Sequence, residues 1–176
     1  MFKRGGTPLQ DGRRIDAAIA GGLERAKAAG CPEPTLRDAV WQLLLEAGET
    51  LRRLPNRERG WLTAVSRSHW PDYLQRSADE MAVGRMAGQR GGRPLPAQPE
   101  AIDRLDIVLL WLPHAGGANP RRDIGILFGL ACGLKVAVLR RQFGCGRRTV
   151  YDVRDRGIAR ICGWLREQSD VCRHLA

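Results

Sequence analysis

Basic side chains gather in the last third of the sequence, where they could bind a polyanion. Residues 133–160 contain eight lysine and arginine residues and two aspartates, a net formal charge of +6, whereas the whole chain of 176 residues carries +10. Arginine suits this role because its planar guanidinium binds phosphates and guanine edges through paired hydrogen bonds. The segment therefore predicts contact with nucleic acid, although a GC-rich genome also enriches arginine.

The apolar residues and glycines around these cations are spaced as in a helix-turn-helix. A short helix is expected from Leu134 to Phe143, followed by a turn at 144–146 and a longer helix from Arg147. Gly144 would supply the positive φ that the turn requires. The residues expected to lock the two helices together are Val136, Leu139, Phe143, Val150, Val153, Gly157, Ile161 and Leu165.

In a DNA-binding motif of this kind the second helix enters the major groove and the first contacts the backbone. The predicted DNA-binding residues are Lys135, Arg140, Arg141, Arg147, Arg148, Thr149, Tyr151 and Arg156. Asp152 and Asp155 lie on the exposed side, where carboxylates repel phosphates. They are expected to pair at i,i+4 spacing, as Arg148 with Asp152 or Asp152 with Arg156, or to accept a bond from a cytosine amine. Arg154 lies close to the buried stripe and must reach the surface or find a partner.

The cysteines do not predict a metal site or a disulfide framework. The five cysteines form an odd set without a CxxC pair, which is typical of reduced thiols. Cys162, Cys172 and His174 match no common zinc spacing. We therefore expect no metal.

Signals for catalysis are equally weak. His69 lies next to Trp70 and close to two serines, but no base and orienting carboxylate can be assigned to it. The glycines at 88, 91 and 92 lack the pattern and context of a phosphate-binding loop. We expect a protein that is not an enzyme and that has no cofactor. Trp61 and Trp70, beside arginines, leave open stacking on unpaired bases.

Helical periodicity dominates the rest of the chain, and no alternating strand pattern is present, so we predict an all-α fold. Thr35 with Asp38 resembles a capping box, and Asn119 followed by Pro120 marks another helix start. The helices expected before the motif span Arg13–Ala29, Thr35–Leu54, Pro71–Val83, Pro99–Leu112 and Pro120–Cys132.

Glycine and proline content divides the chain into regions. We expect a flexible start at residues 1–12, an N-terminal helical region at 13–83 for self-association or partner contact, and a basic linker at 84–98. The helix-turn-helix domain would span residues 99–168, with a tail at 169–176. No apolar run reaches 18 residues and the start of the chain lacks a signal peptide, so we expect a cytoplasmic protein with no membrane contact.

Four segments occur in an order that resembles a known family. They are LEAGETLRRLP (45–55), SHWP (68–71), AIDRLDIVLLWL (101–112) and the predicted motif. Over Val40–Leu165 the chain resembles an uncharacterised family of helix-turn-helix proteins from bacterial genomes and prophages, whose last segment is similar to region 4 of sigma factors. The resemblance implies that Val136 and Leu139 form the core of the first helix and Gly144 the turn. It also implies that Arg147, Thr149 and Val150 start the recognition helix.

Two residues depart from the family pattern. Gly146 replaces the usual serine N-cap, and Arg154 replaces an aromatic or apolar residue. Taken together, the sequence predicts a homo-oligomer that binds double-stranded DNA, as a transcription regulator or as a phage packaging factor like a small terminase subunit. The alternatives are a helical scaffold protein that does not bind DNA and an RNA-binding protein.

Overall fold

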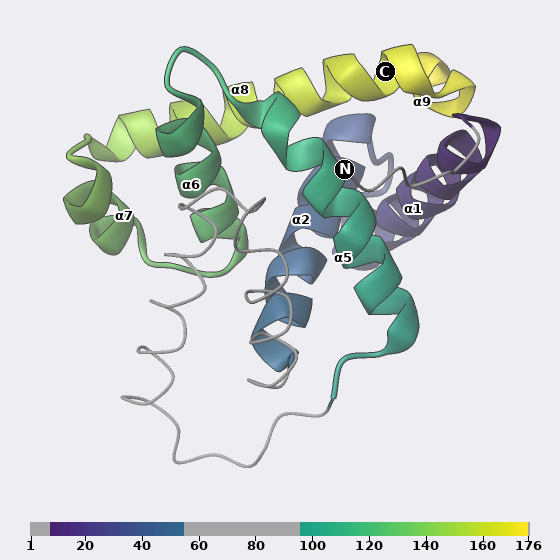
Figure 1. The fold of residues 1–176 in the computed structure, drawn as a ribbon, viewed down its shortest axis with the longest axis horizontal. Helices are drawn as coiled ribbons and strands as arrows, with labels where there is room; N and C mark the ends of the chain where they lie inside the picture. Colours follow the sequence, from purple (N-terminus) through teal and green to yellow (C-terminus); the bar gives the residue numbers. More distant parts are fainter. Residues whose placement is uncertain (1–7, 55–95, 176) are drawn as a thin grey trace, which may run out of the picture.

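The computed structural model describes residues 8–54 and 96–175, and within them all regular secondary structure is helical (Figure 1). The predicted all-α fold is therefore confirmed. The described helices are α1 (Pro8–Ala28), α2 (Leu36–Arg53), α5 (Pro99–Trp111), the 3₁₀ helix η1 (Leu112–Ala115), α6 (Pro120–Ala131), α7 (Val136–Phe143), α8 (Arg147–Gln168) and α9 (Asp170–His174).

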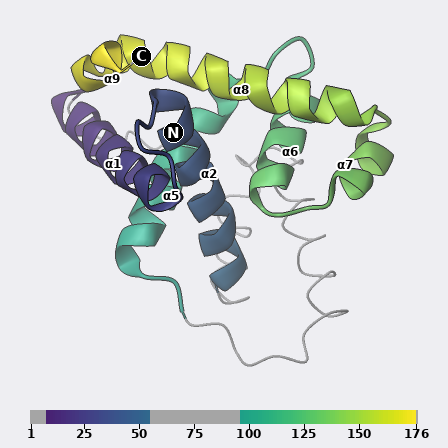
Figure 2. The same ribbon diagram turned by 180° about the vertical axis from the view of Figure 1, so that it is seen from behind.

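Helix α2 forms the centre of the fold, and α1, α5, α6 and α8 all pack against it. Its buried residues lie along one side of the helix and include Leu36, Val40, Leu43 and Leu44. The long helix α8 crosses the whole molecule, from α7 at one end to α9 at the other (Figures 1 and 2). Helix α7 thus lies at one end of the described helices (Figure 1).

The helices before and after residues 55–95 share one hydrophobic core. Ile19 of α1 and Leu43 of α2 belong to the same buried cluster as Val108 of α5, Phe128 of α6 and Ile161 of α8. The expected division into an N-terminal region and a separate helix-turn-helix domain is therefore not seen in the described residues. The physical reason is that α1 and α2 carry more apolar surface than they can bury against each other, so other helices must cover the remainder.

Most helix boundaries agree with the sequence prediction because their end signals are strong. The side chain of Asn119 accepts a hydrogen bond from the Arg122 amide at the start of α6, and Gly144 ends α7. Helix α1 differs, since it begins at Pro8 instead of Arg13, within the segment expected to be flexible. Proline suits the first position of a helix, and a first turn needs no apolar stripe of its own.

The capping box at the start of α2 predicts a loss of stability in acid. The Thr35 hydroxyl and amide donate to Asp38 Oδ2 at 2.7 and 2.9 Å. The hydroxyl bond first, and then the amide bond, lower the pKa of Asp38. Because the pKa is lower in the folded state, the box stabilises the protein above the unfolded pKa of about 3.9, and this contribution is lost as the pH falls through the folded pKa.

We therefore expect Asp38→Asn to lower the free energy of unfolding by about 1 kcal/mol at neutral pH and by less in acid. Urea denaturation over a pH series measures the difference, with the exposed Glu33→Gln variant as control. A difference from wild type that does not change between neutral and acid pH would contradict the assignment.

The C-terminal segment, expected as a tail, folds into the short helix α9 and closes the core. Ser169 caps α9 by accepting a hydrogen bond from the Cys172 amide at 3.1 Å, and its hydroxyl donates to Asp16 of α1. Cys172 is buried, and burial raises its pKa. Burial also raises the pKa of the Cys162 thiol to about 11, so neither thiol is a ready nucleophile at neutral pH.

None of the five cysteines, all of which lie within the described residues, forms a disulfide. None of the described helices combines the length and the apolar character needed to cross a membrane. The predicted helix at Pro71–Val83, residues 84–95 of the predicted linker, and the residues around Trp61, His69 and Trp70 lie outside the described residues.

Candidate nucleic-acid interface

The predicted helix, turn and helix are all present at the end of the molecule opposite α9 (Figure 1). Gly144 ends α7 with φ of 59° and ψ of 38°, the left-handed conformation expected for it. The amide of Cys145 then donates to the Arg140 carbonyl at 3.2 Å. The left-handed Gly144 and this hydrogen bond reverse the chain within three residues, so that α8 starts at Arg147. Residues 135–156 are called the α7–α8 unit below.

A small hydrophobic cluster holds the α7–α8 unit against α6. Leu139 of α7 is fully buried with Val150 and Val153 of α8, as predicted. The third side of the cluster is Ile126 of α6, with Leu130 packed against it. Val136 and Phe143 are partly buried at its edge. The unit is thus part of a three-helix arrangement.

Two glycines of α6 allow α7 to approach closely. A Cβ atom on Gly125 would lie 2.7 Å from Phe143 Cζ, and one on Gly129 would lie 2.7 Å from Leu139 Cδ2. Both distances are too short for a Cβ atom unless the ends of the Phe143 and Leu139 side chains move. The four-residue spacing of these glycines within an apolar helix is visible in the sequence, and it is the signal from which this close approach could have been predicted.

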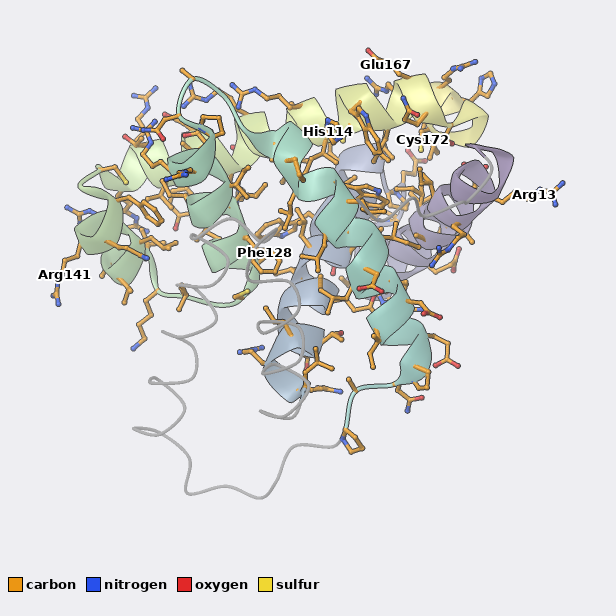
Figure 3. All side chains as sticks on the ribbon, in the orientation of Figure 1. Arg13, His114, Phe128, Arg141, Glu167 and Cys172 are labelled. Carbon is orange, nitrogen blue, oxygen red and sulfur yellow. The ribbon has the colours of Figure 1, made fainter. Side chains whose placement is uncertain are left out.

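The cations of the α7–α8 unit lie on its outer surface. Arg147 and Arg148 occupy the first turn of α8, and the side chain of Arg148 is 95% exposed. The side chains of Lys135, Arg140 and Arg141 are exposed and form no hydrogen bond or ion pair within the described part of the chain. Figure 3 shows Arg141 pointing away from the protein at this end.

The start of α8 also offers backbone donors. Its N-cap is Gly146, and no side chain accepts a hydrogen bond from the first turn. The first amide groups of a helix have no acceptor within the helix and carry a partial positive charge. An anion placed here would therefore meet both amide donors and the guanidinium groups of Arg147 and Arg148.

The two aspartates of α8 are partly offset by neighbouring arginines. Arg148 Nε lies 3.9 Å from Asp152 Oδ2, the i,i+4 pair expected from the sequence. The alternative pairing with Arg156 is not seen, because Arg156 Nε donates to the backbone carbonyl of Asp152 at 3.2 Å. Asp155 accepts a hydrogen bond from Arg154 Nε at 2.8 Å. Both aspartates thus have a cationic neighbour.

An array of stacked side chains connects the start of α8 to α2. The guanidinium of Arg147 lies 6.0 Å from the Tyr151 ring centroid, and that of Arg154 lies 5.4 Å from the same centroid. Arg154 also lies 5.7 Å from the ring of Trp41 on α2. These are cation–π distances. Arg154 therefore finds the partner that its position required, and Trp41 takes part in the array although no local signal in the sequence points to it.

Tyr151, one of the residues predicted to contact DNA, lies at the centre of this array. The ring is half-buried, and the guanidinium groups of Arg147 and Arg154 lie beside it. Thr149 is also half-buried, whereas Arg156 is exposed further along α8. The chemistry available at this surface is the attraction of an anion, and hydrogen bonding to it, by exposed guanidinium and ammonium groups. Among the described residues, no three histidine, cysteine or acidic side chains meet to form a metal site.

Comparison with known proteins identifies a family. Residues 52–161, well over half of the chain, match the family described as Domain of unknown function (DUF6362). The chain belongs to this family. The DUF6362 match includes α5, η1, α6, α7 and the first part of α8, and therefore the whole α7–α8 unit. No curated protein and no solved structure matches the chain.

Proposed function

We propose that this protein binds double-stranded DNA, with the start of α8 in the major groove and α7 against the backbone. The observation that carries the proposal is the exposed set of cations on both helices of a turn-linked pair at one end of the molecule. Arg147 and Arg148 on α8 would contact base edges and phosphates. Lys135, Arg140 and Arg141 on α7 would contact the backbone, since they have no acidic partner among the described residues.

The resemblance to helix-turn-helix proteins supports the same proposal. The buried positions Leu139 and Val150 and the left-handed Gly144 lie where such a motif needs them. A role on DNA would place the protein in the cytoplasm, as a transcription regulator or as a phage packaging factor. A regulator is expected to form a dimer on a short and often palindromic site, whereas a packaging factor is expected to form a ring.

A titration of mixed-sequence duplex DNA at several salt concentrations tests the proposal. We expect wild type to bind with an affinity that falls steeply between about 50 and 200 mM salt, because binding releases counterions from the phosphates. Arg147→Ala/Arg148→Ala is expected to weaken binding by about 30-fold or more, since each arginine contact contributes about 1 kcal/mol or more. The slope of log K against log salt should fall by about 2.

The matched control is Arg52→Ala/Arg53→Ala. These two exposed arginines are also adjacent in sequence, but they lie in the last turn of α2, so the variant loses the same formal charge elsewhere. It should keep most of the wild-type affinity. An equal loss in both variants would mean that general charge attraction, and not the α7–α8 unit, determines binding.

A second candidate is a helical scaffold protein that binds a protein partner and no DNA. The observation that favours it is the pair of aspartates on the exposed side of α8, which would lie near phosphates. Wild type that does not bind duplex DNA even near 50 mM salt would support this candidate. Binding of duplex RNA in preference to DNA would instead support the RNA alternative.

A further inference from the structure

A second surface of the molecule has the features of a protein contact. A groove of about 310 Å³ lies between α1, α5 and the C-terminal half of α8. Ile107 and Trp111 line it as buried apolar side chains. Leu110 also lines it and is 61% exposed, so the groove and the exposed leucine form one apolar surface. Contact of this leucine and this groove with water is unfavourable, so a partner that covers them would lower the free energy.

Charges of opposite sign flank this groove. Arg13 and Arg14 at the start of α1 are exposed and make no hydrogen bond or ion pair with any described residue. Arg14 itself lines the groove. On α5, Glu100 and Asp103 are exposed two to three turns before Leu110. One surface thus contains a protruding apolar side chain, an apolar groove, a basic side and an acidic side.

The basic side of this surface is far from the proposed DNA contact. Figure 3 shows Arg13 and Arg141 at opposite ends of the molecule. The two cations therefore cannot contribute to one compact basic patch. Arg13 and Arg14 therefore form a separate basic area, and the acidic residues of α5 carry the opposite charge on the same surface.

We propose that this surface binds a second copy of the chain about a two-fold axis. A two-fold contact brings the same patch of both copies together, so the patch must be complementary to itself. If the two α5 helices run antiparallel and cross near Ile107, position 103 of one copy faces position 111 of the other. Leu110 then packs at the Ile107 end of the partner's groove, and Asp103 approaches Arg14, which lines the groove together with Trp111, in the other copy.

The proposed dimer contact does not involve the α7–α8 unit, so the proposal of a dimer can be tested independently of DNA binding. Each copy would keep its own cationic end free. A dimer would also favour the role of a regulator over that of a ring-forming packaging factor.

Sedimentation equilibrium of the full chain without DNA tests the proposal. We expect a mass of twice 19.5 kDa at high concentration, with reversible dissociation on dilution. Leu110→Glu should be monomeric throughout, because it places a carboxylate in the apolar contact. Since Leu110 is mostly exposed in one copy, the variant should keep the helical circular dichroism signal of wild type.

Charge reversal tests the arrangement of the two copies. Arg14→Asp and Asp103→Arg should each raise the dimer Kd about tenfold, because like charges then meet twice in each dimer. The double variant Arg14→Asp/Asp103→Arg should restore dimerisation to about the wild-type level. A monomeric wild type, a dimer unaffected by Leu110→Glu, or a double variant without rescue would each overturn the proposal. If wild type is monomeric, the groove would instead be a binding site for a different protein or for a small amphipathic anion.

Discussion

Replacing Gly48 by alanine is expected to lower the free energy of unfolding by about 2 kcal/mol or more, although alanine is the better helix former. Gly48 lies in α2 where α2 crosses the end of α6. A Cβ atom there would lie 2.6 Å from the carbonyl oxygen of Ala131 and 2.9 Å from Cys132 Cα. These are backbone atoms, so relief requires the two helices to move apart and the core between them to open.

The control for Gly48→Ala is Gly163→Ala, which makes the same chemical change in α8. Gly163 is exposed, and a Cβ atom there would have no neighbour within 4 Å. Its replacement should raise the free energy of unfolding by about 0.5 to 1 kcal/mol. Urea denaturation measures both variants. Similar changes of the same sign would show that helix propensity, and not the crossing of α2 and α6, determines the result.

Leu139→Ala is expected to lower the free energy of unfolding by about 2 to 5 kcal/mol, because Leu139 is the fully buried residue of α7 in the small cluster. The damage should be local. Amide hydrogen exchange should accelerate in α7 and the first turns of α8 more than in α2, which belongs to the main core. If the α7–α8 unit binds DNA, the variant should also lose affinity under conditions where the chain is folded.

Val138→Ala on the same helix is the matched control, since Val138 is 43% exposed and belongs to neither cluster. Its effect on stability should stay within about 0.5 kcal/mol. Uniform acceleration of exchange along the chain in Leu139→Ala would contradict a separate role for the small cluster and would indicate a single cooperative unit.

Local signals in the sequence were sufficient to predict many of the helix ends. Thr35, Asn119 and Gly144 each act on the adjacent turn, and each behaves in the structure as its residue type predicts. Apolar periodicity likewise identified the buried faces of α2 and α8. Such signals depend on neighbours within a few residues, which is why single-sequence reasoning can read them.

Contacts between distant segments were the main feature that the sequence did not predict. Periodicity says which face of a helix is buried, but it does not say which helix covers it. Helix α6 has buried residues at every position from Asp123 to Phe128, and it serves both hydrophobic clusters. The stacking of Arg154 on Trp41 joins α8 to α2, and neither the residue types nor their local spacing predicts this contact. The same limit explains why two regions were expected where the described helices form one core.

The sharing of α8 between the two clusters restricts how this protein can change. Val150 and Val153 secure the α7–α8 unit, while Ile158 and Leu165, further along the same uninterrupted helix, belong to the main core. The α7–α8 unit therefore cannot be transferred to another protein as a separate segment, because cutting α8 would remove residues that the main core needs. New binding preferences would have to arise by substitution of exposed residues in place, one position at a time.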